Sequence, residues 1–254
     1  MCTLTYFPEQ LEPEHSARWI FFNRDEQRSR LPAQAPVLFR GSDTNYLMPL
    51  DPESGGSWMG LSGNGFFVCV INNYPDLPRT GFVPRAGFAE GQAFPRSRGL
   101  IIRDILNAGT FPDIRVLEEI LRKHNYAPFF LAAFAVNRSG IWEWNGKRIR
   151  QSVVSGVRQA GILSSNLKTS DIPKQREAQF KNLHRYNISS LKRFHRNRRK
   201  APEAAVLMRR DDARTVSVSE ICLKRGGGSI CYYGAPPFIW GQKSSLKFTA
   251  SVGV

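Results

Sequence analysis

The sequence begins MCTLTYF and places a cysteine directly behind the initiator methionine. Because cysteine is small, Met1 is expected to be removed, so that the mature chain starts at Cys2 with a free α-amino group. Such an amine has a pKa of about 7.7–8.0 and can take the thiol proton at cellular pH. One residue would then supply both a nucleophile and its base. The simpler alternative is a small apolar residue that opens an edge strand.

A polar cluster follows the apolar segment RWIFF without a spacer: Asn23, Arg24, Asp25 and Glu26. At the end of a strand these side chains can meet a nucleophile on the neighbouring strand. A carboxylate of Asp25 or Glu26 can hold the terminal ammonium, and Arg24 can lower the pKa of the thiol. The alternative is a charged turn with an internal Arg–carboxylate pair.

The rest of the sequence offers few other reactive groups. The histidines at positions 15, 124, 184 and 195 have no cysteine or aspartate placed to form a dyad, and the cysteines at positions 2, 69, 222 and 231 lack metal-ligand spacing. The segment RGGGS at 225–229 lacks the Lys-Ser/Thr of a phosphate-binding loop and predicts a hairpin. We therefore expect no metal and no cofactor.

These residues require a scaffold, and the sequence predicts one of alternating strands and helices. Short apolar segments rich in Ile, Val and Phe predict strands up to residue 74, and helical spacing follows, with a stop at Gly109 and a start at Asp113. Three strand-like segments from residue 129 form a predicted meander, a second helical region runs from about Gln175 to Arg196, and further strands close the chain. This order favours antiparallel sheets with helices packed outside, in one domain spanning residues 1–254.

The charge balance is strongly basic, with 36 Lys+Arg against 21 Asp+Glu and a formal net charge of +15. Such a surface attracts nucleic acid, anionic lipid or acidic substrates. The densest basic cluster, residues 191–200, can contact phosphates as an arm, or it can be the solvated end of a helix, which we favour because no nucleic-acid-binding motif accompanies it. The first twenty residues lack a signal-peptide pattern, and no apolar stretch of about 18 residues is present. We expect a soluble, cytoplasmic protein.

Several motifs in fixed order resemble the NRDE family, also called the transport and Golgi organisation protein 2 family. They are MCTLTYF at the start, NRDE at 23–26, GGSWMGL at 55–61, INNY at 71–74, SRGLIIRDIL at 97–106 and LSSN at 163–166. The matches span most of the chain, and the last third matches least well.

The resemblance implies a fold and a site. The family is similar to the N-terminal nucleophile hydrolases, which are α+β proteins with a four-layer αββα sandwich of two antiparallel sheets between helices. In the related cysteine-type amidases the nucleophile is the cysteine exposed by Met removal, which Cys2 matches. A carboxylate near the first hairpin assists the amine there, with Asp25 the closest match and Glu26 the other candidate. Those amidases also carry an Arg three residues before the Asp; Phe22 stands there in this chain, and Arg24 is a shifted substitute.

Two asparagines complete the site implied by the resemblance. Asn73 in INNY and Asn166 in LSSN match family asparagines and are expected as oxyanion or substrate donors. Removal of one oxyanion donor typically costs about 2.7–4 kcal/mol of transition-state stabilisation. The alternative for either residue is a turn at a strand end.

The leading hypothesis is a hydrolase that acts on an amide or other acyl bond of an unknown small-molecule substrate. Family members are linked to Golgi organisation, lipid or acyl-CoA handling and haem trafficking without an agreed reaction. A second hypothesis is therefore a carrier of a lipid-like or haem-like ligand in the same pocket. A third, weaker hypothesis is association with nucleic acid through the 191–200 cluster.

Overall fold

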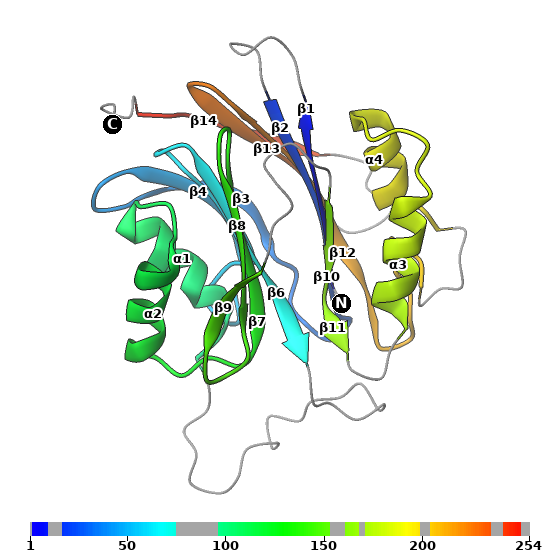
Figure 1. Cartoon of the computed structure of the whole chain (residues 1–254), viewed down its shortest axis with the longest axis horizontal. Helices are drawn as coiled ribbons and strands as arrows, with labels where there is room; N and C mark the ends of the chain where they lie inside the picture. Colours follow the sequence, from blue (N-terminus) through cyan, green and yellow to red (C-terminus); the bar gives the residue numbers. More distant parts are fainter. Residues whose placement is uncertain are drawn as a thin grey trace, which may run out of the picture.

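Two antiparallel sheets stack face to face, and helices cover the outer face of each, which gives four layers (Figure 1). The computed structural model describes residues 2–9, 17–74, 96–152, 161–167, 171–198, 204–234 and 241–249. This arrangement confirms the predicted α+β sandwich.

Among the described residues, the first sheet has six strands in the order β10-β1-β2-β12-β13-β14. Their bounds are Gly161–Ser164 for β10, Thr3–Glu9 for β1, Ala17–Gln27 for β2, Ala213–Lys224 for β12, Gly227–Gly234 for β13 and Gln242–Lys247 for β14. The N-terminal strand β1 is thus an inner strand, because β10 covers its outer edge.

The second sheet has the order β3-β4-β5-β6-β7-β8-β9 and takes up a short additional strand, β11, which pairs with β6 in parallel. The bounds are Gln34–Arg40 for β3, Asn45–Leu50 for β4, Met59–Ser62 for β5, Phe66–Tyr74 for β6, Phe129–Ala135 for β7, Ser139–Trp144 for β8, Ile149–Ser152 for β9 and Asn166–Leu167 for β11. The strands β7, β8 and β9 form the predicted meander.

In the described part of the chain, two helices lie on each outer face (Figure 1). The second sheet is covered by α1 (Gly99–Ala108) and α2 (Ile114–Lys123), and the first by α3 (Ile172–Lys181) and α4 (Ile188–His195). The predicted boundaries at Gly109 and Asp113 are confirmed: Gly109 has φ 64° at the end of α1, and the Asp113 side chain accepts a hydrogen bond from the Val116 amide at the start of α2.

The second predicted helical region is divided into α3 and α4. The division arises because Asn187 begins a new helix: its side chain accepts a hydrogen bond from the Ser190 amide, and the Ser190 hydroxyl in turn accepts one from the Asn187 amide. This reciprocal cap satisfies backbone donors that a continuous helix would have used internally.

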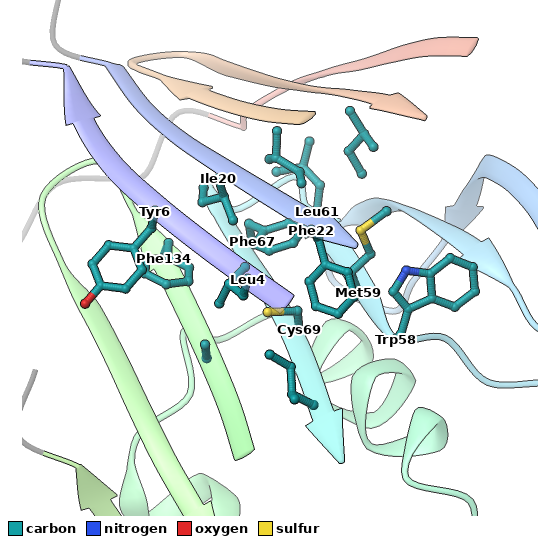
Figure 2. Packing of buried hydrophobic residues seen from close by; sticks show 14 of the residues in the cluster. Leu4, Tyr6, Ile20, Phe22, Trp58, Met59, Leu61, Phe67, Cys69 and Phe134 are labelled. Carbon is teal, nitrogen blue, oxygen red and sulfur yellow. The ribbon is translucent and has the colours of Figure 1, made fainter. Parts of the chain in front are cut away.

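Side-chain alternation along β1 and β2 assigns each residue to one of two buried layers. Even-numbered apolar residues of these two strands, Leu4, Ile20 and Phe22, enter the layer between the sheets, where they pack with Met59, Leu61 and Phe67 of the second sheet (Figure 2). Odd-numbered residues such as Phe21 instead face α3 and α4. Because successive residues of a strand point to opposite faces, strand position decides on which side each candidate site residue lies.

No helix in the described part of the chain is long and apolar enough to cross a membrane.

Candidate active site at the start of the first strand

Cys2 lies just before β1 and is buried, with its side chain in the layer between the sheets. Its backbone nitrogen donates to the Ser165 hydroxyl oxygen at 2.9 Å, and the Ser165 amide donates to the Cys2 carbonyl at 3.0 Å. The Cys2 sulfur lies 4.0 Å from the Asp25 carbonyl oxygen. Burial raises the pKa of the Cys2 thiol, the nearby Asp25 carboxylate raises it further, and Arg24 opposes both effects. Met1 lies outside the described residues, so its removal stays a prediction.

The NRDE residues belong to β2 and form no turn. Strand alternation therefore separates them: Arg24 shares the inter-sheet side with Cys2, whereas the side chains of Asn23 and Asp25 face the helices. A bulge in the pairing with β12 falls at this point, where Arg24 pairs with Ser217 and Asp25 with Thr215. Four adjacent residues thus contribute to two distinct clusters.

Asp25 forms a fully buried ion pair with Arg176 of α3. One carboxylate oxygen accepts from the Thr215 hydroxyl at 2.6 Å and the other from Arg176 Nη1 at 3.3 Å. Arg176 also donates to the Thr3 hydroxyl at 2.6 Å and to the Ala205 carbonyl at 2.8 Å. The pair therefore fixes the residue that follows Cys2. The assignment of Asp25 to the α-amine stays a prediction, because the nitrogen of Cys2 contacts Ser165 in the described structure.

Sequence reasoning missed Arg176, although α3 contains one signal for it. Arg176 and Phe180 are the buried residues of this otherwise polar helix, and their spacing of four places them on one face. An arginine that shares a face with a core phenylalanine is expected to be buried, and a buried charge requires compensating partners.

Asn23 attaches α4 to the first sheet. Its side-chain nitrogen donates to the carbonyls of His195 and Val206, so its oxygen accepts from His195 Nδ1 at 2.7 Å. The Nδ1-protonated ring leaves Nε2 to accept from the Thr5 hydroxyl at 2.8 Å. Burial lowers the pKa of His195 to about 3, and the nearby Arg176 adds to this effect. The ring is therefore neutral and structural.

Arg24 is the cation on the side of the nucleophile. Its guanidinium lies 4.3 Å above the Trp58 ring and donates to Asp51 at 2.9 Å and to Glu26 at 3.2 Å. Arg30 joins the same carboxylates, at 2.8 Å from Asp51 and 3.7 Å from Glu26. Glu26 therefore belongs to a partly exposed ion-pair network at the edge of the layer between the sheets. Arg24 packs against the ring of Trp58.

The parallel pairing of β11 with β6 brings two distant asparagines together. Asn166 lies opposite Asn73, directly after the Ser165 that holds the Cys2 nitrogen. Asn73 is 1% exposed and donates through Nδ2 to Glu143 Oε1 at 2.9 Å. The side chain of Asn166 lies outside the described part of the structure, so its role as a donor stays a prediction, as does that of Asn73.

Ser165 and Glu143 were not identified from the sequence. Ser165 precedes Asn166 in the motif LSSN, and its place in this motif was the sequence signal that could have identified it. Glu143 lies in the alternating segment GIWEWNG, where its odd position shares a face with Ile141 of the inter-sheet layer.

The basic cluster at 191–200 contributes largely to packing where it is described, up to residue 198. Leu191, Phe194 and His195 are buried against the first sheet. Lys192 and Arg196 pair with the buried Glu220 at 2.9 and 3.2 Å. This arrangement is typical of a helix end attached to a sheet.

Within the described ranges, no group of three or more His, Cys, Asp or Glu residues is placed to hold a metal ion.

The four layers, with the N-terminal strand inside one sheet and Cys2 at its start, are the fold of the N-terminal nucleophile hydrolases. The chain belongs to the family described as Transport and Golgi organisation 2, which matches residues 1–233. A comparison with curated proteins gave no match.

Solved structures of hydrolases are similar to this chain. The Caenorhabditis elegans ortholog of N-acylethanolamine-hydrolyzing acid amidase is 13% identical, with a TM-score of 0.53 over 87% of this chain and 92% of that one. The R18L variant of conjugated bile acid hydrolase from Clostridium perfringens is 11% identical, with a TM-score of 0.46 over 98% of each chain. The C2A mutant of the same enzyme is 11% identical, with a TM-score of 0.44 over 97% of each chain. At such identities the first similarity shows the fold alone.

Proposed function

We propose that the protein is an N-terminal cysteine hydrolase that cleaves an amide or another acyl bond of a small molecule. The observation that carries the proposal is the position of Cys2: its nitrogen is held by Ser165, and its sulfur enters the layer between the sheets on the side of Arg24. This position supports a site in which processed Cys2 supplies both nucleophile and base, with the Arg24 cation on the same side.

The reaction follows from the chemistry of an N-terminal cysteine. The α-amine of the processed chain takes the thiol proton as sulfur attacks the carbonyl carbon, and it then returns that proton to the leaving group. The resulting thioester is cleaved by water, with the same amine as base. Because burial raises the pKa of the thiol, Cys2 stays protonated until a base removes the proton.

The surrounding residues have supporting roles in this proposal. The Ser165 hydroxyl oxygen accepts a hydrogen bond from the Cys2 nitrogen and so orients its lone pair, and the Asp25–Arg176 pair holds Thr3 and the start of β1. Asn166 directly follows Ser165 in the chain and is the residue that we propose as a donor to the oxyanion.

The test is labelling of the processed protein, confirmed by intact mass, with an acylating β-lactone probe. We expect a single adduct on Cys2, which is absent in Cys2→Ala. The rate of labelling should fall about 100-fold after the α-amine is acetylated. Cys231→Ala, which removes a partly exposed thiol, serves as the matched control and retains the label.

The alternative is a carrier of a lipid-like or haem-like ligand. It is favoured by the apolar cluster in which the Cys2 side chain lies, formed with residues such as Leu4 and Phe22. Absence of an adduct on Cys2, together with an apolar ligand that co-purifies with the protein, would support this alternative and contradict hydrolysis.

A further inference from the structure

The amide group of Asn73 has a defined orientation. Its Nδ2 lies 2.9 Å from Glu143 Oε1, and an ionised carboxylate only accepts hydrogen bonds. The nitrogen end of the amide is therefore the end that faces β8, and the oxygen end points away from it.

The strand pairing shows what lies on the other side. On the β7 side, Asn72 pairs with Phe129 and the Asn73 amide donates to the Pro128 carbonyl at 3.2 Å. The opposite edge of β6 at this point is occupied by β11, with Asn166 opposite Asn73. Nδ2 of Asn73 thus reaches across β7 towards β8, while the backbone of Asn73 stands opposite Asn166, which directly follows the Ser165 that holds the Cys2 nitrogen.

Oδ1 of Asn73 is buried and has no hydrogen-bond partner among the residues that the structure describes. Buried polar atoms in folded proteins are nearly always paired, and exceptions mark sites where a ligand or a reacting group supplies the partner. An amide oxygen accepts only, so the missing group is a donor.

We infer that Asn73 is a specificity residue whose Oδ1 accepts a hydrogen bond from the N–H of a scissile amide, so that the protein selects amides over the corresponding esters. This inference rests on the proposed hydrolase function. An ester has no N–H, and its oxygen lone pairs face the Asn73 oxygen. A site built around an N–H group discriminates by up to roughly 10⁴–10⁵ against an analogue that lacks it.

The inference differs from an oxyanion role for Asn73 in a measurable way. An oxyanion forms from amides and esters alike, so loss of an oxyanion donor slows both reactions equally. Loss of an acceptor for the leaving-group N–H slows amide hydrolysis selectively. The ratio of the two rates therefore separates the roles.

The test uses two substrates with the same acyl group, a p-nitroanilide and a p-nitrophenyl ester, and the processed full-length protein. We expect Asn73→Ala to lower kcat/KM for the anilide about tenfold more than kcat/KM for the ester. Asn72→Ala, on the opposite face of β6, is the matched control and leaves the ratio unchanged.

Glu143→Gln provides a second readout if Asn73→Ala fails to fold. The glutamine can donate to Oδ1, so the Asn73 amide loses its fixed orientation and the anilide-to-ester ratio falls several-fold. Equal loss on both substrates, or an unchanged ratio in both variants, would overturn the inference alone. Failure of the unmodified protein to hydrolyse either substrate in a Cys2-dependent way would instead remove the proposed function, and the inference with it.

Discussion

Replacement of Arg176 by methionine should destabilise the protein more than any surface change on the same helix. The variant keeps most of the aliphatic stem but removes the donors to Asp25, Thr3 and Ala205. Both side chains of the ion pair are fully buried, so solvent does not screen the loss. Breaking a buried pair by removing one partner costs about 3–5 kcal/mol, because the other charge remains buried without compensation.

The assay is urea unfolding monitored by circular dichroism. The urea concentrations at the unfolding midpoint are compared between variants whose free energy of unfolding depends on urea with the same slope. Against a typical free energy of unfolding of about 5–15 kcal/mol, the expected loss is a large fraction of the total. Lys174→Met is the matched control: Lys174 is 84% exposed, lies 3.6 Å from Asp171, and should change stability by less than about 0.5 kcal/mol.

A double-mutant cycle isolates the pair itself. Asp25→Asn combined with Arg176→Met removes both charges, so the double variant should be destabilised by less than the sum of the single variants. A loss below about 1 kcal/mol for Arg176→Met, or strict additivity of the two changes, would refute the reasoning that this buried pair holds the start of β1.

Two further predictions concern pH and packing. The folded pKa of His195 is about 3, below the ordinary value of about 6.5, so the unfolded chain takes up a proton first as the pH falls. The contribution of His195 to the free energy of unfolding is therefore complete above about pH 6.5 and is lost towards pH 3, by up to about 1.4 kcal/mol per pH unit. In urea unfolding measured at a series of pH values, His195→Gln should reduce this dependence of the free energy on pH. His184→Gln, at an exposed position, should not reduce it. Gly56→Ala would bring a Cβ within 2.6 Å of the Gly99 carbonyl carbon and should cost roughly 1–3 kcal/mol, visible as a lower melting temperature; an unchanged melting temperature would contradict the close approach.

Local patterns in the sequence predicted much of the scaffold. The stop at Gly109 and the start at Asp113 are confirmed because both depend on short-range chemistry, a left-handed glycine and a side-chain cap. The meander from residue 129 is confirmed for the same reason, since turn residues and alternation are local signals. The division of the second helical region was missed because the cap at Asn187 competes with apolar spacing that continues across it.

The candidate site was only partly predictable. The ordered motifs indicated Cys2, Asn73 and Asn166, but the side of the sheet on which each NRDE residue lies depends on the register of β2. A shift by one residue would exchange Arg24 and Asp25 between the two faces. The prediction that Asp25 or Glu26 assists the α-amine of Cys2 stays a prediction; in the described structure Asp25 pairs with Arg176 and Glu26 with Arg24.

By itself, the sequence determined the position of Cys2 behind Met1, the pattern of strands and helices, and the motifs that mark the family. Each of these is encoded within a few neighbouring positions. Only the tertiary structure decided the partners: Ser165 for the nitrogen of Cys2, Arg176 for Asp25 and Glu143 for Asn73, at sequence separations of 163, 151 and 70 residues. Such contacts are set by strand register and by the stacking of layers, which depend on the whole chain folding at once, so local sequence signals at one residue do not identify its partner.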